Sequence, residues 1–315
     1  MNTQPSAPAS ERHAQLLALA DSLRPELHRY CARLMGSVID GEDVVQDTFV
    51  RAYQAFPELD AATPLRPWLF RIAHNRALDL LRGRAVRLTE TMDAADHIAD
   101  TANRDPEEML MRQQAVKTAV SRFGELPLLQ RSVVILKDVL DESLIEIAAL
   151  LDLSVDAVKA HLARGRGRLR EIHAQGDQAV NARPASAAVA RYVALFNQRD
   201  WDGLRALLAD DVKLHQSAYP VRVGSADVGT FFTHYARLDA VWLAPAWLNT
   251  GVGGREVIAV YRDRADTKPS YIMWLEWKAG RIVTIRDYRY VAYVVAEAEL
   301  MFAPDATPAT DTATF

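Results

Sequence analysis

Residues 142–171, ESLIEIAALLDLSVDAVKAHLARGRGRLRE, decide the fold of the first half of the chain. The stretch predicts two helices, the first over Glu142–Leu151 and the second starting after Ser154, with the turn Asp152-Leu153-Ser154 between them. Ser154 suits a helix start because its hydroxyl can accept a hydrogen bond from a free backbone N–H of the first turn. The arrangement is typical of a helix-turn-helix, and an αα-hairpin with a solvated basic face is the alternative. We expect a small shared core of Ile147, Leu150, Val158 and Leu162.

The second of these helices concentrates positive charge beside two glycines, Gly165 and Gly167. Because Val158 and Leu162 are expected to face the core, the remaining positions face outward, where the major groove of DNA can receive them, and small residues let the helix come close to the DNA. Phosphate contacts supply affinity and base-edge contacts supply sequence choice. A solvated helix end, favoured by the helix dipole, is the alternative for the last arginines. The expected DNA contacts are Lys159, His161, Ala163, Arg164, Arg166 and Arg168.

Charge is unevenly distributed along the 315 residues, whose formal net charge is −4. Residues 66–87 contain six arginines and one acid, whereas residues 89–108 contain seven acids and one arginine. The basic helix at 154–171 follows. Two cationic helices joined by an acidic segment indicate contact with a polyanion at two places.

Residues 11–88 predict further helices, with apolar residues at helical spacing. In EDVVQDTFVRAYQAF, residues 42–56, one face is apolar and the opposite face is polar. The expected apolar stripe is Val44, Val45, Phe49, Ala52, Tyr53 and Phe56, and the expected polar face is Asp43, Gln46, Asp47 and Arg51.

The second half of the chain has a different character. Residues 188–211 predict two short helices with Asp200 as the N-cap of the second. A short strand at 212–216, a helix at 225–238 and four alternating, aromatic-rich strands between 241 and 290 follow. Helices followed by a strand meander predict an α+β fold. The last residues, from 298 to 315, are expected to be disordered.

Composition excludes several classes of protein. No run of about 18 apolar residues suggests a membrane span, and the N-terminal MNTQPSAPASERHAQ lacks the apolar core of a signal peptide. A single cysteine, Cys31, excludes an intramolecular disulfide and a zinc site built on several cysteines. No metal-ligand spacing and no phosphate-binding glycine loop occurs. We expect a cytoplasmic protein without metal or cofactor.

Two motifs carry a family resemblance. The stretch EDVVQDTFVRAY…RPWLFRIAHNRALDLLRGR resembles region 2 of the extracytoplasmic-function (ECF) group of bacterial sigma factors, and ELPLLQRSVVILKDVLDESLIEIAALLDLSVDAVKAHLARGRGRL resembles their region 4. Residues 187–297 resemble a SnoaL-like domain of the cone-shaped nuclear-transport-factor-like fold. The expected organisation is therefore region 2 at 11–88, an acidic linker at 89–106, region 4 at 107–172, a second linker at 173–186 and the SnoaL-like domain at 187–297.

The resemblance implies a sigma factor that directs core RNA polymerase to promoter DNA. In region 2 it implies polymerase binding by Asp43, Gln46 and Asp47, and contact with unstacked promoter bases after the loop at 56–67. The implied DNA contacts are Trp68, His74, Asn75 and Arg76, with a core position as the alternative for Trp68.

The C-terminal domain is expected to regulate the sigma factor in cis, through intramolecular docking or a small-molecule ligand, and not to be an enzyme. The alternative is a SnoaL-type enzyme fused to DNA-binding helices, with His215 and Asp287 as an acid–base pair. The candidate pocket residues are His215, Trp247, Trp274, Asp287 and Tyr288.

Overall fold

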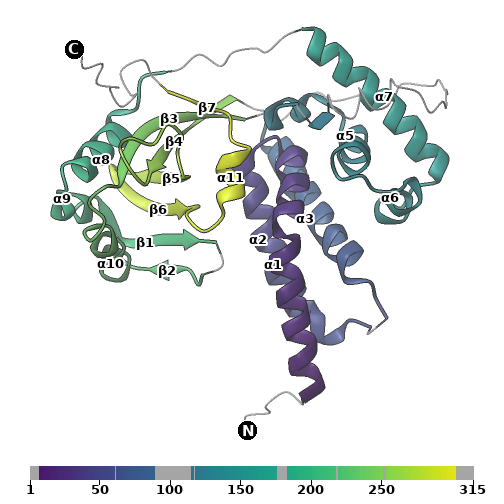
Figure 1. The fold of residues 1–315 in the computed structure, drawn as a ribbon, viewed down its shortest axis with the longest axis horizontal. Helices are drawn as coiled ribbons and strands as arrows, with labels where there is room; N and C mark the ends of the chain where they lie inside the picture. Colours follow the sequence, from purple (N-terminus) through teal and green to yellow (C-terminus); the bar gives the residue numbers. More distant parts are fainter. Residues whose placement is uncertain are drawn as a thin grey trace. The chain divides into compact units, whose positions relative to one another are not determined.

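The structure, a computed structural model, describes residues 7–60, 62–88, 115–116, 118–175, 183–217, 219–250 and 253–302. The chain divides into two compact units, Met1–Gln178 and Ala179–Phe315. The first unit is helical, and the second combines helices with one sheet (Figure 1). Within the described ranges, no helix has the length and apolarity that crossing a membrane requires.

The first unit starts with three helices, α1 (Ala7–Met35), α2 (Val38–Ala55) and α3 (Leu65–Leu88), with a short 3-10 turn η1 (Phe56–Glu58) after α2. Ser37 caps α2 by accepting a hydrogen bond from the Asp40 backbone N–H. Gly41 allows α1 and α2 to approach closely, because a Cβ atom there would lie 2.5 Å from the backbone of Ala32. A larger residue at this position would push the two helices apart.

The same unit continues with η2 (Val120–Glu125), α5 (Leu128–Val134), a π-helical turn η3 (Ile135–Val139), α6 (Leu144–Leu151) and α7 (Val155–Ala174). Ser143 and Glu146 form a capping box at the start of α6, and Ser154 caps α7. Asp152 ends α6 in the left-handed conformation, with φ 56° and ψ 49°, which Asp tolerates better than most residues. The predicted helix-turn-helix is confirmed.

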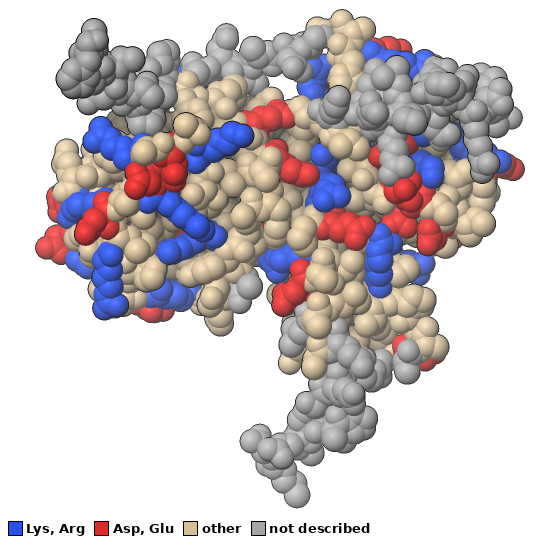
Figure 2. Space-filling model, in the orientation of Figure 1, with Lys and Arg blue, Asp and Glu red and all other residues tan. Residues whose placement is uncertain are grey.

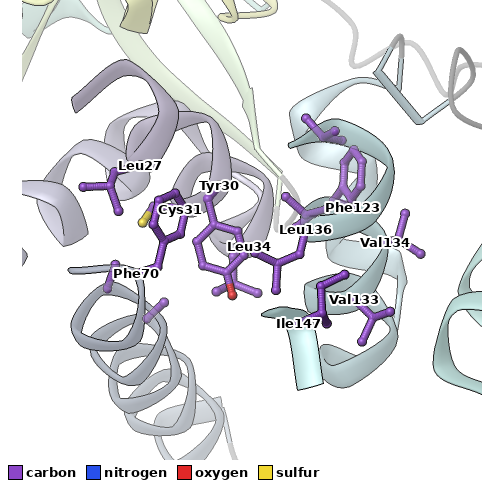
Figure 3. Packing of buried hydrophobic residues seen from close by; sticks show 14 of the residues in the cluster. Leu27, Tyr30, Cys31, Leu34, Phe70, Phe123, Val133, Val134, Leu136 and Ile147 are labelled. Atoms are coloured by element: carbon purple, nitrogen blue, oxygen red, sulfur yellow. The ribbon is translucent and has the colours of Figure 1, made fainter. Parts of the chain in front are cut away.

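One hydrophobic cluster spans both parts of the first unit (Figure 3). Leu27, Tyr30 and Leu34 on α1 belong to the same cluster as Phe123 on η2 and Leu136 on η3. The buried Arg131 of α5 donates to the Leu34 carbonyl at 2.7 Å and ties α5 to the end of α1. Cys31 is also buried there; burial, with a smaller effect of Glu42, raises the pKa of its thiol far above the ordinary value. The thiol is therefore a packing group and not a nucleophile.

The second unit contains α8 (Ala187–Asn197), α9 (Trp201–Arg205), α10 (Ser225–Tyr235) and a seven-stranded sheet of order β2-β1-β6-β5-β4-β3-β7. As predicted, Asp200 caps the second helix, and four consecutive strands form an antiparallel meander. These strands are β3 (Trp242–Thr250), β4 (Gly253–Tyr261), β5 (Tyr271–Lys278) and β6 (Arg281–Asp287). The earlier strand β1 (Leu208–Gln216) pairs in parallel with β6.

Several boundaries differ from the sequence predictions. The chain forms β2 (Arg222–Val223), α11 (Ala292–Ala296) and β7 (Leu300–Met301), none of which the sequence patterns predicted. The tail predicted from 298 is wrong at its start, because β7 pairs with β3. The predicted start of the second linker, residue 173, is also too early, since α7 continues to Ala174. The acidic linker at 89–106 lies outside the described residues, as does the tail after 302.

Candidate functional site

The outward face of α7 is the best-exposed cationic surface of the helix-turn-helix. Val158 and Leu162 are buried, as predicted, and this leaves Lys159, Ala163 and Arg168 exposed. Between them, the Arg164 guanidinium lies 3.3 Å from Nδ1 of His161. Partial burial, followed by the Arg164 charge, lowers the pKa of His161, which favours a neutral ring that can donate and accept hydrogen bonds.

Arg166 points away from that face. Its guanidinium forms a bidentate ion pair with Asp138 on η3, with Nε 2.9 Å from Oδ2 and Nη2 2.6 Å from Oδ1. Only 1% of the Asp138 side chain is exposed. The expected phosphate contact of Arg166 would require this buried pair to break.

The two glycines of α7 have different surroundings. A Cβ atom on Gly165 would lie 2.6 Å from Cγ2 of Val134 and 3.2 Å from the Gln130 carbonyl oxygen on α5. The prediction that Gly165 faces DNA is therefore wrong, because this residue is buried against α5 and allows the two helices to pack closely. A Cβ atom on Gly167 would meet nothing within 4 Å.

On α3, the expected DNA-contact residues separate into two groups. Asn75 is exposed and Trp68 is half-buried against the hydrophobic cluster. His74 is 6% exposed, and its Nδ1 lies 2.7 Å from the Tyr30 hydroxyl. Burial, with a smaller effect of Arg82, lowers the pKa of His74 to about 4. The structure thus places His74 in the core, away from any DNA that approaches the surface.

The polar face of α2 carries Asp43, Gln46 and Asp47, all half-buried. Asp47 accepts a hydrogen bond of 2.7 Å from Nε of Arg76 on α3, so two residues with different predicted partners contact each other here. Tyr53 was expected in the apolar stripe, but 55% of this residue is exposed, as is 57% of Val50. The α2 surface therefore offers apolar as well as acidic groups to a partner.

In the second unit, His215 and Asp287 do not form a pair. In the parallel ladder of β1 and β6, Gln216 lies opposite Asp287 and His215 lies opposite Arg286. Successive side chains of a strand point to opposite faces, so His215 and Asp287 lie on opposite faces of the sheet. Asp287 instead accepts a 2.8 Å hydrogen bond from Nε2 of Gln216. Burial raises the pKa of Asp287 to about 6.

The five candidate pocket residues do not converge on one site. Trp274 lies opposite Arg286 in the β5–β6 ladder and shares the His215 face, with Arg286 Cζ 5.7 Å from its ring centre. Trp247 lies on β3, three strands from β6, and its Nε1 donates to the Arg183 carbonyl at 2.9 Å. Tyr288 is buried directly after β6.

Three tyrosines, none of them among the candidates, cluster near Asp287 instead. Tyr192 of α8 and Tyr235 of α10 are buried, and the Tyr235 hydroxyl bonds the hydroxyl of Tyr271 on β5. Burial, followed by the Asp287 charge, raises the pKa of all three hydroxyls. The sequence gives no local signal for this cluster, because α8, α10 and β5 come together only through the packing of the two helices with the sheet. No group of three or more His, Cys, Asp or Glu side chains in the described part of the chain could hold a metal ion.

The fold and the exposed face of α7 define a helix-turn-helix protein with an appended α+β domain. Comparison with known families agrees. Residues 19–87 match Sigma-70 region 2, residues 120–169 match Sigma-70, region 4, and residues 189–285 match the SnoaL-like domain. Below, region 2 means α1 to α3 and region 4 means η2 to α7.

Individual relatives are sigma factors. ECF RNA polymerase sigma factor SigW of Bacillus subtilis is 31% identical over 49% of this chain and 86% of its own length. RNA polymerase sigma factor CnrH of Cupriavidus metallidurans is 37% identical over 41% of this chain and 71% of its own. ECF RNA polymerase sigma factor SigG of Mycobacterium tuberculosis is 32% identical over 62% of this chain, and the match spans 60% of the SigG length. The chain belongs to the ECF sigma factor family and carries a SnoaL-like C-terminal domain.

Proposed function

We propose that this protein directs core RNA polymerase to specific promoters and so initiates transcription. The observation that carries the proposal is the exposed cationic face of α7, on a helix-turn-helix that matches region 4, in the same chain as a region 2. Lys159 and Arg164 would contact base edges of the upstream element, and Arg168 would contact phosphate. Ala163 and His161 lie between them on the same surface.

Region 2 supplies the second DNA contact and the polymerase contact in this proposal. Asn75 and Trp68 on α3 offer a polar and a flat side chain to the unstacked bases of the downstream element. Asp43, Gln46 and Asp47 on α2 offer an acidic face to a basic surface of the polymerase. Reversing the charge at Asp43 and Asp47 should weaken binding to core polymerase without unfolding the protein, and unchanged affinity of the folded variant would reject this assignment.

Transcription of genomic DNA by core polymerase with the purified full chain, followed by sequencing of the RNA starts, tests the proposal as a whole. We expect starts that share two upstream elements and that disappear when the chain is omitted. Starts that are the same with and without the chain would overturn the proposal.

We infer that the SnoaL-like domain regulates the sigma regions in cis and does not catalyse a reaction. The separation of His215 from Asp287 onto opposite faces of the sheet supports this inference against the acid–base pair. A domain that binds one arrangement of the two sigma regions better than another shifts their populations.

Ending the chain after Ala182 should change promoter-dependent transcription several-fold, whereas His215→Ala and Asp287→Asn should act only through packing. A truncated chain with the activity and promoter selectivity of the full chain would reject the regulatory role. Small-molecule turnover that either point variant abolishes would favour the enzyme.

A further inference from the structure

Two arginines of α3 contact region 4, and neither is among the DNA contacts expected from the sequence. The Arg66 guanidinium bonds the carboxylates of Glu26 on α1 and Glu142, which precedes α6. Five residues further along α3, Nη2 of Arg71 donates to the Ala149 carbonyl of α6 at 3.0 Å. Region 4 therefore supplies an acceptor to each of these guanidiniums.

The contact between α3 and α6 is polar at its edge and borders a cavity. The cavity, of about 110 Å³, is lined on the α3 side by Pro67 and Phe70 and on the α6 side by Ile147 and Leu150. Phe70 and Ile147 also belong to the buried hydrophobic cluster that both regions share. The Arg131 bond to the Leu34 carbonyl, between α5 and the end of α1, is a second contact of region 4 with region 2.

The two arginines are close together along α3. They are five residues apart, so their Cα atoms are displaced by about 7.5 Å along the helix axis, and both guanidiniums reach acceptors of region 4. Arg66 also lies with Cζ 5.0 Å from the ring centre of Phe70, which restricts the guanidinium on the α3 surface. If Glu142 withdrew, Glu26 would still hold Arg66 in place, because Glu26 belongs to region 2.

We propose that Arg66 and Arg71 form a phosphate-binding pair for promoter DNA, and that Glu142 and the Ala149 carbonyl occupy this pair in the free protein. Region 4 then competes with DNA for region 2, and Glu142 takes the place of a phosphate. Separation of α6 from α3 removes the region 4 acceptor from both guanidiniums at once. The inference rests on the proposed function for its DNA partner, but the intramolecular competition can be measured without DNA.

The closed contact is tested by fluorescence energy transfer in the full chain. Labels go on cysteines introduced at Gln54 on α2 and at the exposed Asp156 on α7, with the buried Cys31 replaced by Ala. Glu142→Gln should lower the population with high transfer, and added salt should do the same to the parent chain, because screening weakens partly exposed pairs. Glu125→Gln is the matched control, because Glu125 pairs with Arg122 inside region 4.

DNA binding is measured with a single-stranded oligonucleotide that carries the downstream element of a mapped promoter, so that α7 does not contribute. Glu142→Gln should bind several-fold more tightly than Glu125→Gln. Arg71→Ala should lower the high-transfer population and also bind several-fold more weakly, which separates a DNA contact from a mere fastening of the two regions.

Unchanged transfer and unchanged affinity in Glu142→Gln, with native circular dichroism, would overturn the proposal, as would tighter binding by Arg71→Ala. If the parent chain supported no promoter-specific transcription with core polymerase, the proposed function would fail instead. The transfer measurement would still report whether Glu142 closes the contact.

Discussion

The two cationic helices of the first unit use similar side chains in opposite ways. On α3, Arg66, Arg76 and Arg84 each reach a carboxylate on another element, with Arg84 3.1 Å from Asp40 on α2. On α7, Lys159 and Arg168 each pair with an acid three residues away on the same helix, the one salt-bridge partner that either has in the described part of the chain, and stay exposed. The visible face of the molecule accordingly mixes blue and red side chains instead of showing one basic field (Figure 2). The number of cations in a helix is therefore a poor guide to its surface, because the placement of the carboxylates decides which cations remain available.

The largest effect is expected where α7 departs from its own pattern. Arg166→Ala would leave the buried Asp138 carboxylate without its ion-pair partner, and removal of one partner of a buried pair costs about 3–5 kcal/mol. Arg168→Ala, two residues away and exposed, should change the free energy of unfolding by less than about 0.5 kcal/mol. Urea unfolding followed by far-UV circular dichroism compares them. Loss of DNA affinity in Arg166→Ala without loss of stability would show that the Arg166 guanidinium contacts DNA.

Acid should affect α3 more than α7. The His74 pKa of about 4 lies below the ordinary histidine value of 6.5, so the folded state disfavours the protonated ring. Stability is fully present above pH 6.5 and falls as pH drops towards 4, by on the order of 3 kcal/mol in total. His74→Gln should flatten this part of the curve of unfolding free energy against pH. The His161 ring keeps some solvent contact, so His161→Gln should flatten the curve of unfolding free energy against pH less. Equal slopes of this curve in the two variants would contradict the burial argument.

DNA binding should distinguish two cations of α7 from each other. Lys159→Ala should cost about 1–3 kcal/mol on the cognate upstream element if the residue reads a base, and less on other sequences. Arg168→Ala should weaken binding evenly across sequences and lower the salt slope by about 1. Titration of holoenzyme against cognate and scrambled promoters at several salt concentrations measures both. An equal loss of affinity on cognate and scrambled promoters in both variants would show that Lys159 does not read a base.

The smallest effects concern the two glycines of α7. Gly165→Ala gains helix propensity of about 1 kcal/mol but forces a methyl group against Val134, and overpacking costs about 1–3 kcal/mol. Gly167→Ala meets nothing within 4 Å and should stabilise the unit by about 0.5–1 kcal/mol. Opposite signs in urea unfolding are expected. Two stabilised variants would mean that Val134 can move aside.

Sequence patterns predicted the helices of the first unit well, because capping and apolar periodicity are local. Ser154, Asp152 and the inward pair Val158 and Leu162 all behave as the pattern indicated. The roles of individual charges were not predictable in the same way. The acceptor of Arg166 is 28 residues away in the chain and that of Arg66 is 76 residues away, so only the folded arrangement decides which cations are occupied.

In the second unit, the meander β3 to β6 was predictable, but the strands that pair with its two ends were not all predictable. Alternation and turn residues located β3 to β6, since neighbouring antiparallel strands leave a local signal. The two-residue strands β2 and β7 are too short to show alternation. The separation of His215 from Asp287 depends on the β1–β6 register, which joins distant segments. The cluster of Tyr192, Tyr235 and Tyr271 was missed because it depends on how α8 and α10 pack with β5, which no local pattern shows.

The parallel pairing of β1 with β6 has a consequence during synthesis. The ribosome must add 71 residues after Gln216, the end of β1, before β6 is complete at Asp287, which takes roughly 4–14 s at about 5–20 residues per second. The helical unit, whose last helix α7 ends at Ala174, has been synthesised by then. Each new chain thus spends several seconds with its helix-turn-helix made and its C-terminal sheet still open. A burst of synthesis raises the number of chains in this state, in which the proposed regulation by the C-terminal domain cannot yet operate.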